Sequence, residues 1–158
     1  MGQLEFRPLS AADLPLIATW VARPHVAEWW DGPIALDHGL RHFIAVLEGQ
    51  PIGYVQSYQA AACHGDGWWL EVTDPGVHGI DQFLADAAKL GQGLGTQLVR
   101  AFVAGLFTDP GVTLVQADPS PENLRAIRCY EKAGFRRVRE IVTPDGPALL
   151  MHRERVLP

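Results

Sequence analysis

A glycine-rich stretch directly before an amphipathic run constrains this chain more than any other feature of its sequence. The stretch reads Leu90-Gly91-Gln92-Gly93-Leu94-Gly95-Thr96, and the run Gln97–Phe107 follows at once. Leu or Phe recurs at every fourth position from Leu94 to Leu106, which is the spacing of one buried helix face. Glycines let a backbone loop approach a ligand, and a helix N-terminus offers unpaired N–H groups and a positive dipole end. The stretch favours a phosphate or pyrophosphate site, although such turns also serve as plain connections.

The bulk composition indicates one domain over residues 1–158. The chain has 158 residues, 47% of them hydrophobic, which is enough for a core. Because no segment is long and apolar enough for a bilayer and the start lacks a signal-peptide pattern, we expect no membrane partner and a cytoplasmic location. The two cysteines and six histidines show no metal-ligand spacing, so no metal is expected.

The charge is divided unevenly along the chain. The net charge of −5 argues against a nucleic-acid partner. Residues 1–88 hold 3 Lys or Arg and 11 Asp or Glu, whereas residues 89–158 hold 10 and 7, so the halves carry −8 and +3. One explanation is that the acidic residues form a solvated face. The other is that the acidic half of the chain attracts a cation and the basic half holds an anion.

Periodicity and turn residues predict a mixed α/β domain in which helices cover a single sheet. Strands are expected over Leu4–Pro8, Phe43–Leu47, Ile52–Tyr58, His78–Ala85, Val112–Ala117, Phe135–Val142 and Ala148–Arg155. Helices are expected over Ala11–Val21, capped by Ser10, over Ile34–Leu40, Gln97–Phe107 and Glu122–Ala133, the last closed by Gly134. Arg23-Pro24 is expected to end the first helix. The segment His25–His42 is expected to be largely irregular. Its Trp29-Trp30 pair either borders a pocket or covers the core as a lid.

The segment from Asn123 to Phe135 reads Asn-Leu-Arg-Ala-Ile-Arg-Cys-Tyr-Glu-Lys-Ala-Gly-Phe. With the glycine loop before it, this segment resembles the GNAT N-acetyltransferases. The resemblance implies a central, mostly antiparallel, twisted sheet flanked by helices, with acetyl-CoA in a V-shaped split between the central strands. It implies cofactor contacts at Gln82, Phe83, Gly91, Gln92, Gly93, Leu94, Gly95, Thr96, Asn123, Ala126, Tyr130 and Lys132. The family loop usually begins with Arg or Gln, where this chain has Leu90.

Several further segments resemble one branch of that family, the aminoglycoside 6'-N-acetyltransferases. They include Glu28-Trp29-Trp30, Gly65-Asp66-Gly67-Trp68-Trp69, Gly79-Ile80-Asp81-Gln82, Asp118-Pro119-Ser120-Pro121 and Thr143-Pro144-Asp145-Gly146-Pro147. This resemblance implies acetylation of the 6'-amino group of an aminoglycoside, an activity that confers antibiotic resistance. Members of the branch carry a longer segment where this chain has only Asp31–His42.

The chemistry of such a transfer assigns two catalytic roles. An alkyl amine near pKa ~9–10 is mostly protonated at pH 7, so the site needs an acceptor for its proton and a donor for the departing thiolate. We expect Asp81 to be the base, directly or through a water, and Tyr130 to be the acid. The alternatives are a solvated carboxylate at a strand end for Asp81 and a packed helix tyrosine for Tyr130.

An aminoglycoside carries several ammonium groups and flat sugar rings. A pocket for it needs several carboxylates and aromatic surfaces. The substrate-binding residues expected from the resemblance are Trp30, Gln56, Tyr58, Asp66, Trp68, Asp81, Asp118 and Asp145. Asp118 precedes a proline and Asp145 a glycine, so formation of a turn is the alternative role for both.

Three functions remain open from the sequence. The first is direct acetyl transfer in a ternary complex with an aminoglycoside, because no cysteine lies where the base or acid is expected. The second keeps the fold but acetylates another amine, such as a protein N-terminus, a polyamine or a siderophore precursor. The third is a CoA-binding module without activity, against which the presence of Asp81, Tyr130 and the glycines argues. We expect a monomer or a homodimer.

Overall fold

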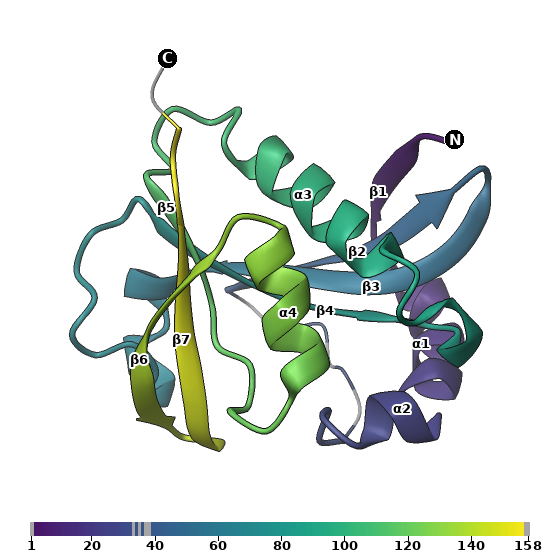
Figure 1. Ribbon diagram of the computed structural model, residues 1–158, viewed down its shortest axis with the longest axis horizontal. Helices are drawn as coiled ribbons and strands as arrows, with labels where there is room; N and C mark the ends of the chain where they lie inside the picture. Colours follow the sequence, from purple (N-terminus) through teal and green to yellow (C-terminus); the bar gives the residue numbers. More distant parts are fainter. Residues whose placement is uncertain (1, 33, 35, 37–38, 157–158) are drawn as a thin grey trace.

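One seven-stranded sheet forms the centre of the molecule (Figure 1). The computed structural model describes residues 2–32, 34, 36 and 39–156. The strand order is β1-β2-β3-β4-β5-β7-β6, and all neighbours are antiparallel except β4 and β5. The strands are β1 (Leu4–Pro8), β2 (Leu40–Leu47), β3 (Gln50–Gln59), β4 (Val77–Leu84), β5 (Leu114–Ala117), β6 (Arg136–Thr143) and β7 (Gly146–Glu154).

Helices cover both faces of the sheet. They are α1 (Leu14–Val21), α2 (Pro24–Ala27), α3 (Leu94–Leu106) and α4 (Leu124–Lys132). Leu98 and Phe102 of α3 and Ile127 of α4 pack on the face that carries Ala45 and Val55. On the other face, α1 and α2 pack with Ile44, Tyr54 and Phe83. None of the described helices is long and apolar enough to cross a membrane. The predicted GNAT architecture is confirmed.

The sheet splits between β4 and β5. These parallel strands pair over only three positions, from Val77 with Leu114 to Gly79 with Gln116. β4 then continues to Leu84, whereas β5 ends at Ala117 and is followed by Asp118-Pro119. Proline has no N–H to donate to a ladder, so the pairing stops there. The result is the split between central strands that the resemblance implies.

The region between α1 and β2 departs from the sequence prediction. Pro24 does not simply end a helix but occupies the first turn of α2, where its missing N–H is tolerated. The predicted helix over Ile34–Leu40 is wrong at its described positions, because Ile34 and Leu36 are not helical and Leu40 begins β2. Residues 35, 37 and 38 of that prediction lie outside the described residues. The strand begins at Leu40, before its predicted start at Phe43, because the hydrogen-bond ladder of β2 with β3 includes Leu40, Arg41 and His42.

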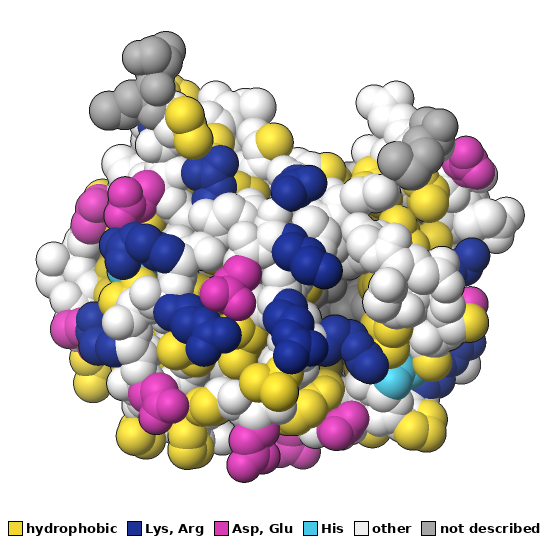
Figure 2. Space-filling view, in the orientation of Figure 1, with side chains coloured by type: hydrophobic (Ala, Val, Ile, Leu, Met, Phe, Trp, Pro, Cys, Tyr) yellow, Lys and Arg dark blue, Asp and Glu magenta, His cyan; other side chains and the backbone are white. Residues whose placement is uncertain are grey.

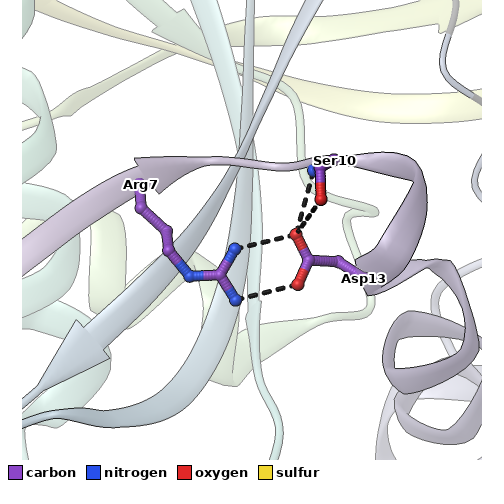
Figure 3. A network of polar contacts seen from close by, with 3 residues as sticks. All are labelled: Arg7, Ser10 and Asp13. Atoms are coloured by element: carbon purple, nitrogen blue, oxygen red, sulfur yellow. Dashed lines mark hydrogen bonds and ion pairs between the residues drawn. The ribbon is translucent and has the colours of Figure 1, made fainter.

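The connection from β1 into α1 is held by a short polar network (Figure 3). The guanidinium of Arg7 donates to both carboxylate oxygens of Asp13 at 2.7 and 2.8 Å. The backbone N–H of Ser10 also donates to Asp13, at 2.9 Å, which forms the predicted cap at the start of the helical segment. These donors hold the pKa of Asp13 well below its usual range.

We expect Asp13→Asn to lower the free energy of unfolding by about 1 kcal/mol at pH 7, because the cap and the Arg7 ion pair are both weakened. A depressed carboxyl pKa stabilises the folded state above the unfolded value near 4 and ceases to do so as the pH falls. Urea unfolding of both proteins should therefore show a difference that shrinks below about pH 4. Glu5→Gln, at an exposed carboxylate of β1, is the control. Equal effects of the two substitutions would contradict the network.

Candidate active site

Two cavities meet at the split in the sheet. The larger has a volume of about 870 Å3 and the smaller about 520 Å3. They share the lining residues Trp29, Trp30, Gln82, Asn123 and Ala126. Gln82 lies on β4 beyond the last residue that pairs with β5, so the edge of β4 that does not pair with β3 borders the cavities here.

The two cavities carry opposite charge. The larger is lined by Asp31, Asp66, Asp81, Asp118 and Asp145, and no Lys or Arg of the described chain lines it. The smaller is lined by His25, Arg125, Arg128 and Lys132, and by no Asp or Glu among the residues described. Figure 2 shows Lys and Arg side chains gathered over the face that α3 and α4 cover in Figure 1. The arrangement suits a cation in one cavity and an anion in the other.

Asp81 and Asp118 form a coupled pair of carboxyl groups. Because Gly79 pairs with Gln116 in parallel register, Asp81 and Asp118 each follow two residues later, where the strands part. Burial raises the pKa of both groups, and the charge of Asp81 raises the pKa of Asp118 further. Their shared hydrogen bond lowers the pKa of Asp81 and raises that of Asp118. Two neighbouring carboxyl groups do not both ionise easily, and the Gln56 side-chain N–H, which donates to Asp81 Oδ2 at 3.0 Å, favours the charge on Asp81.

Tyr130 lies on α4 with its ring buried against Phe135, at a centroid distance of 5.2 Å. Its side chain lines the larger cavity together with Gln82. Burial, followed by the nearby charge of Asp81, raises the pKa of Tyr130 well above its usual value. Its hydroxyl consequently stays protonated at neutral pH and is a hydrogen-bond or proton donor.

The glycine loop forms one wall of the smaller cavity. Gly91 and Gly93 have positive φ angles of 77° and 82°, which explains the need for glycine at both positions. Gly93 is the N-cap of α3, so the first turn of α3 presents its N–H groups beside the cavity. Gly95 lies inside that turn, where an added Cβ would lie 3.4 Å from the sulfur of Cys129.

Aromatic side chains line part of the larger cavity. Trp30 packs edge-on against Tyr54 and Phe83, with centroid distances of 5.7 and 5.2 Å. Tyr58 stacks on Trp69 at 6.2 Å, and its hydroxyl accepts a hydrogen bond from buried Gln116. Trp29 and Trp30 both line the cavities, which favours the pocket-border interpretation of this pair over a core lid.

The predicted site residues fall into these two cavities with few exceptions. All the residues expected to contact substrate line the larger cavity: Trp30, Gln56, Tyr58, Asp66, Trp68, Asp81, Asp118 and Asp145. Most of those expected to contact the cofactor line the smaller one: Gln82, Phe83, Gly91, Gly93, Gly95, Thr96, Asn123, Ala126 and Lys132. Their roles stay predictions.

Two predicted cofactor side chains do not line either cavity. Gln92 turns back and donates to the carbonyl of Ala88 at 2.8 Å, and Leu94 packs against the core. Asn123 has a structural role as well, because its side chain caps α4 by accepting from the N–H of Ala126. Asp145 occupies the β6–β7 turn and also lines the larger cavity, so the turn role and the pocket position coexist.

Three basic cavity residues were not predicted from the sequence. Arg125 and Arg128 share one face of α4 with Lys132, and their i, i+3, i+7 spacing was the available signal. His25 belongs to the unpredicted helix α2 and its ring bonds the carbonyl of Leu84 at 2.8 Å. The described residues contain no group of three or more side chains that could hold a metal ion.

Comparison with known proteins identifies close relatives. An acetyltransferase (GNAT) domain matches residues 10–143. The aminoglycoside N(6')-acetyltransferase type 1 of Klebsiella pneumoniae is 51% identical over 165 aligned residues, which cover 94% of this chain and 82% of that protein. The structure of AAC(6')-Ib with paromomycin and acetyl-CoA superposes with a TM-score of 0.92 at 50% identity, over 97% of this chain and 94% of that one. AAC(6')-Ib with coenzyme A and kanamycin gives 0.91 at 52% identity, over 97% and 95%.

We expect Asp118→Asn to raise the melting temperature at pH 8 by about 2–4 °C, a gain on the order of 1 kcal/mol. A raised carboxyl pKa means that folding takes up a proton, so the wild-type protein loses stability as the pH rises above the unfolded value near 4. The amide is neutral at every pH and can still donate to Asp81. The difference should therefore vanish towards pH 4 in thermal melts. Glu122→Gln, at an exposed carboxylate, should show no such trend, and a destabilised Asp118→Asn protein at pH 8 would argue against the shared proton.

Proposed function

Because this chain belongs to the GNAT family of acetyltransferases, we propose that it transfers the acetyl group of acetyl-CoA to the 6'-amino group of an aminoglycoside, directly and within a ternary complex. The observation that carries the proposal is the meeting of an acidic and a basic cavity at Gln82. Acetyl-CoA is a polyanion and an aminoglycoside is a polycation. Each cavity has the charge that suits one of the two substrates, and the reacting groups would meet where the cavities join.

The smaller cavity has the residues that acetyl-CoA needs. The N–H groups at the start of α3 and the cations of Arg125, Arg128 and Lys132 suit its phosphate groups. Gln82 and Phe83 pair with β3 but have no strand on the β5 side of β4, which leaves that edge of the backbone available for the amides of the pantetheine arm. The resemblance to AAC(6')-Ib structures that contain acetyl-CoA or coenzyme A supports this assignment.

The larger cavity has the residues that an aminoglycoside needs. Its carboxylates are spread over separate loops, with Asp66 before β4, Asp118 after β5 and Asp145 between β6 and β7. Such spacing matches ammonium groups distributed over several sugar rings. Trp30 and Trp68 add flat surfaces for sugar faces or cations.

Asp81 and Tyr130 line the larger cavity beside Gln82 and supply the two proton transfers. In the proposed reaction the amine nitrogen forms a bond to the thioester carbonyl carbon, and the carbon–sulfur bond breaks. The amine proton passes to Asp81, the ionised member of its carboxyl pair, directly or through a water. Tyr130 gives its proton to the departing thiolate of CoA.

The position of Cys129 supports direct transfer over an acetyl-cysteine intermediate. Cys129 lines the smaller cavity, with its sulfur 3.9 Å from the Thr96 hydroxyl, and does not line the larger cavity that holds Asp81 and Tyr130. Burial raises the pKa of this thiol, which disfavours the thiolate that a nucleophile requires.

The function is tested by measuring CoA release with acetyl-CoA and a panel of amines. The panel holds kanamycin, paromomycin, tobramycin, spermidine and a peptide with an N-terminal alanine. We expect saturable turnover with aminoglycosides that have a 6'-amino group, at kcat/KM on the order of 10⁴ per molar per second or more. Paromomycin has a hydroxyl at that position and should inhibit without reacting. Faster turnover of spermidine or the peptide would assign the enzyme to another acceptor.

We expect Tyr130→Phe to lower kcat by about 10²–10⁴-fold and to leave the Kd of acetyl-CoA within about twofold, because only the proton donor is lost. Asp81→Asn should lower kcat to a similar extent. It should also remove the fall of kcat at low pH, the acidic limb of the pH–rate profile. Steady-state kinetics and calorimetric titration with acetyl-CoA measure these quantities. Parallel losses of kcat and acetyl-CoA affinity in Tyr130→Phe would show that the tyrosine has a structural role instead.

A further inference from the structure

We propose that His42 and Tyr54 are positioning residues for acetyl transfer, which act on Asp81 by fixing the orientation of the Gln56 side-chain amide. The inference rests on the proposed function, because it takes Asp81 as the base. The network reaches across the sheet from Asp81 on β4 to His42 on β2: Asp81, Gln56 and His42 line the larger cavity, and Tyr54 is buried beside them.

The register of the sheet aligns these residues. His42 on β2 pairs with Gln56 on β3, and Gln56 pairs with Asp81 on β4, so the three side chains form one row on the same face. Tyr54 lies two residues before Gln56 and therefore on that face too. The row ends at Asp81, where the sheet splits.

A continuous series of hydrogen bonds runs along the row. The Gln56 amide nitrogen donates to Asp81 Oδ2 at 3.0 Å, and the Tyr54 hydroxyl donates to Gln56 Oε1 at 2.7 Å. His42 Nδ1 lies 2.5 Å from the Tyr54 oxygen. Each bond constrains the next, because an ionised carboxylate only accepts and a tyrosine hydroxyl has a single proton.

These constraints determine the direction of every bond. The carboxylate of Asp81 requires the NH₂ end of Gln56, which leaves the carbonyl end of Gln56 towards Tyr54. The Tyr54 proton is used on that carbonyl, so His42 must donate from a protonated Nδ1. If His42 carried no proton on Nδ1, Tyr54 would donate to it and the Gln56 amide would lose the partner that defines its orientation.

Packing prevents Tyr54 from leaving this position. Its side chain is fully buried, stacked on Phe83 at 5.4 Å and edge-on to Trp30 at 5.7 Å. A fixed hydroxyl holds the Gln56 carbonyl, and the opposite end of the same amide is held on Asp81. Reversal of the amide would place its oxygen against the carboxylate and favour protonation of Asp81, which would remove the base.

The consequence is a specific effect on the ionisation of Asp81. The Gln56 hydrogen bond lowers the pKa of this carboxyl, against the effect of burial and of Asp145. The titratable groups that face Asp81 come from the loop after β5, the β6–β7 turn, α4 and β3: Asp118, Asp145, Tyr130 and Tyr58. Weakening the Gln56 bond should raise the pKa of Asp81 and move the acidic limb of the rate to higher pH.

A double-mutant cycle tests the proposal. The rate of acetyl transfer to kanamycin in a single turnover is measured against pH for the wild-type enzyme, Tyr54→Phe, Gln56→Met and the double variant. We expect each single variant to lose about tenfold in rate at pH 6 and to move the acidic limb up by about one pH unit. The double variant should match Gln56→Met with no further shift, because Tyr54 acts only through Gln56. Additive losses, or an unmoved limb in Tyr54→Phe, would overturn the proposal.

Two substitutions at His42 separate hydrogen bonding from packing. Asn and Leu have the same shape, but only Asn offers an N–H donor at the position of Nδ1. In His42→Asn the acidic limb of the pH–rate profile should stay near its wild-type pH. In His42→Leu it should move to higher pH, as it does in Tyr54→Phe. If the rates of the two variants fall at the same acidic pH, the role of His42 is contradicted.

Asp81→Asn tests the base itself. If the rate of this variant still falls at acidic pH as in the wild-type enzyme, the proposed function of Asp81 as the base fails. If that fall disappears in Asp81→Asn but is not shifted in Tyr54→Phe, only the positioning role fails.

Discussion

The short parallel ladder between β4 and β5 is the constraint on which the rest of the site depends. Three residue pairs join the two halves of the sheet, and then β5 ends at Ala117, two residues before Pro119, while β4 continues. Beyond Gly79, β4 keeps its pairing with β3 but has no strand on its β5 side, and both cavities lie along this opening. A ladder extended to Leu84 would leave no room for either substrate.

The split also produces the electrostatic character of the site. Asp81 and Asp118 lie at equivalent positions two residues past the last pair, so the separation of the strands brings two carboxyl groups together in a buried place. Burial raises the pKa of both groups, which costs stability at neutral pH, and the hydrogen bond from Gln56 favours the charge on Asp81. A buried pair of carboxyl groups that costs stability is a feature typical of functional sites.

The basic and acidic cavities come from different parts of the fold. The basic residues lie on one helix, α4, and on α2, next to a glycine loop whose positive φ angles shape the approach to α3. The carboxylates come from loops, from the β6–β7 turn and from β4. The charges suit a polyanion in one cavity and a polycation in the other, and Gln82 lines both cavities.

The sequence alone determined the local features, because each depends on residues a few positions apart. The glycine loop, the face of α3, the Ser10 and Gly134 caps and the Asn123–Phe135 segment were all evident from spacing, and the family resemblance followed from them. Only the tertiary structure decided which distant side chains meet, since this depends on strand register. It placed His42, Gln56 and Asp81 in one row, turned Gln92 away from the cavity, and made Pro24 the start of a helix. The spacing of residues along a chain carries no information on such cross-strand pairings until the sheet has formed.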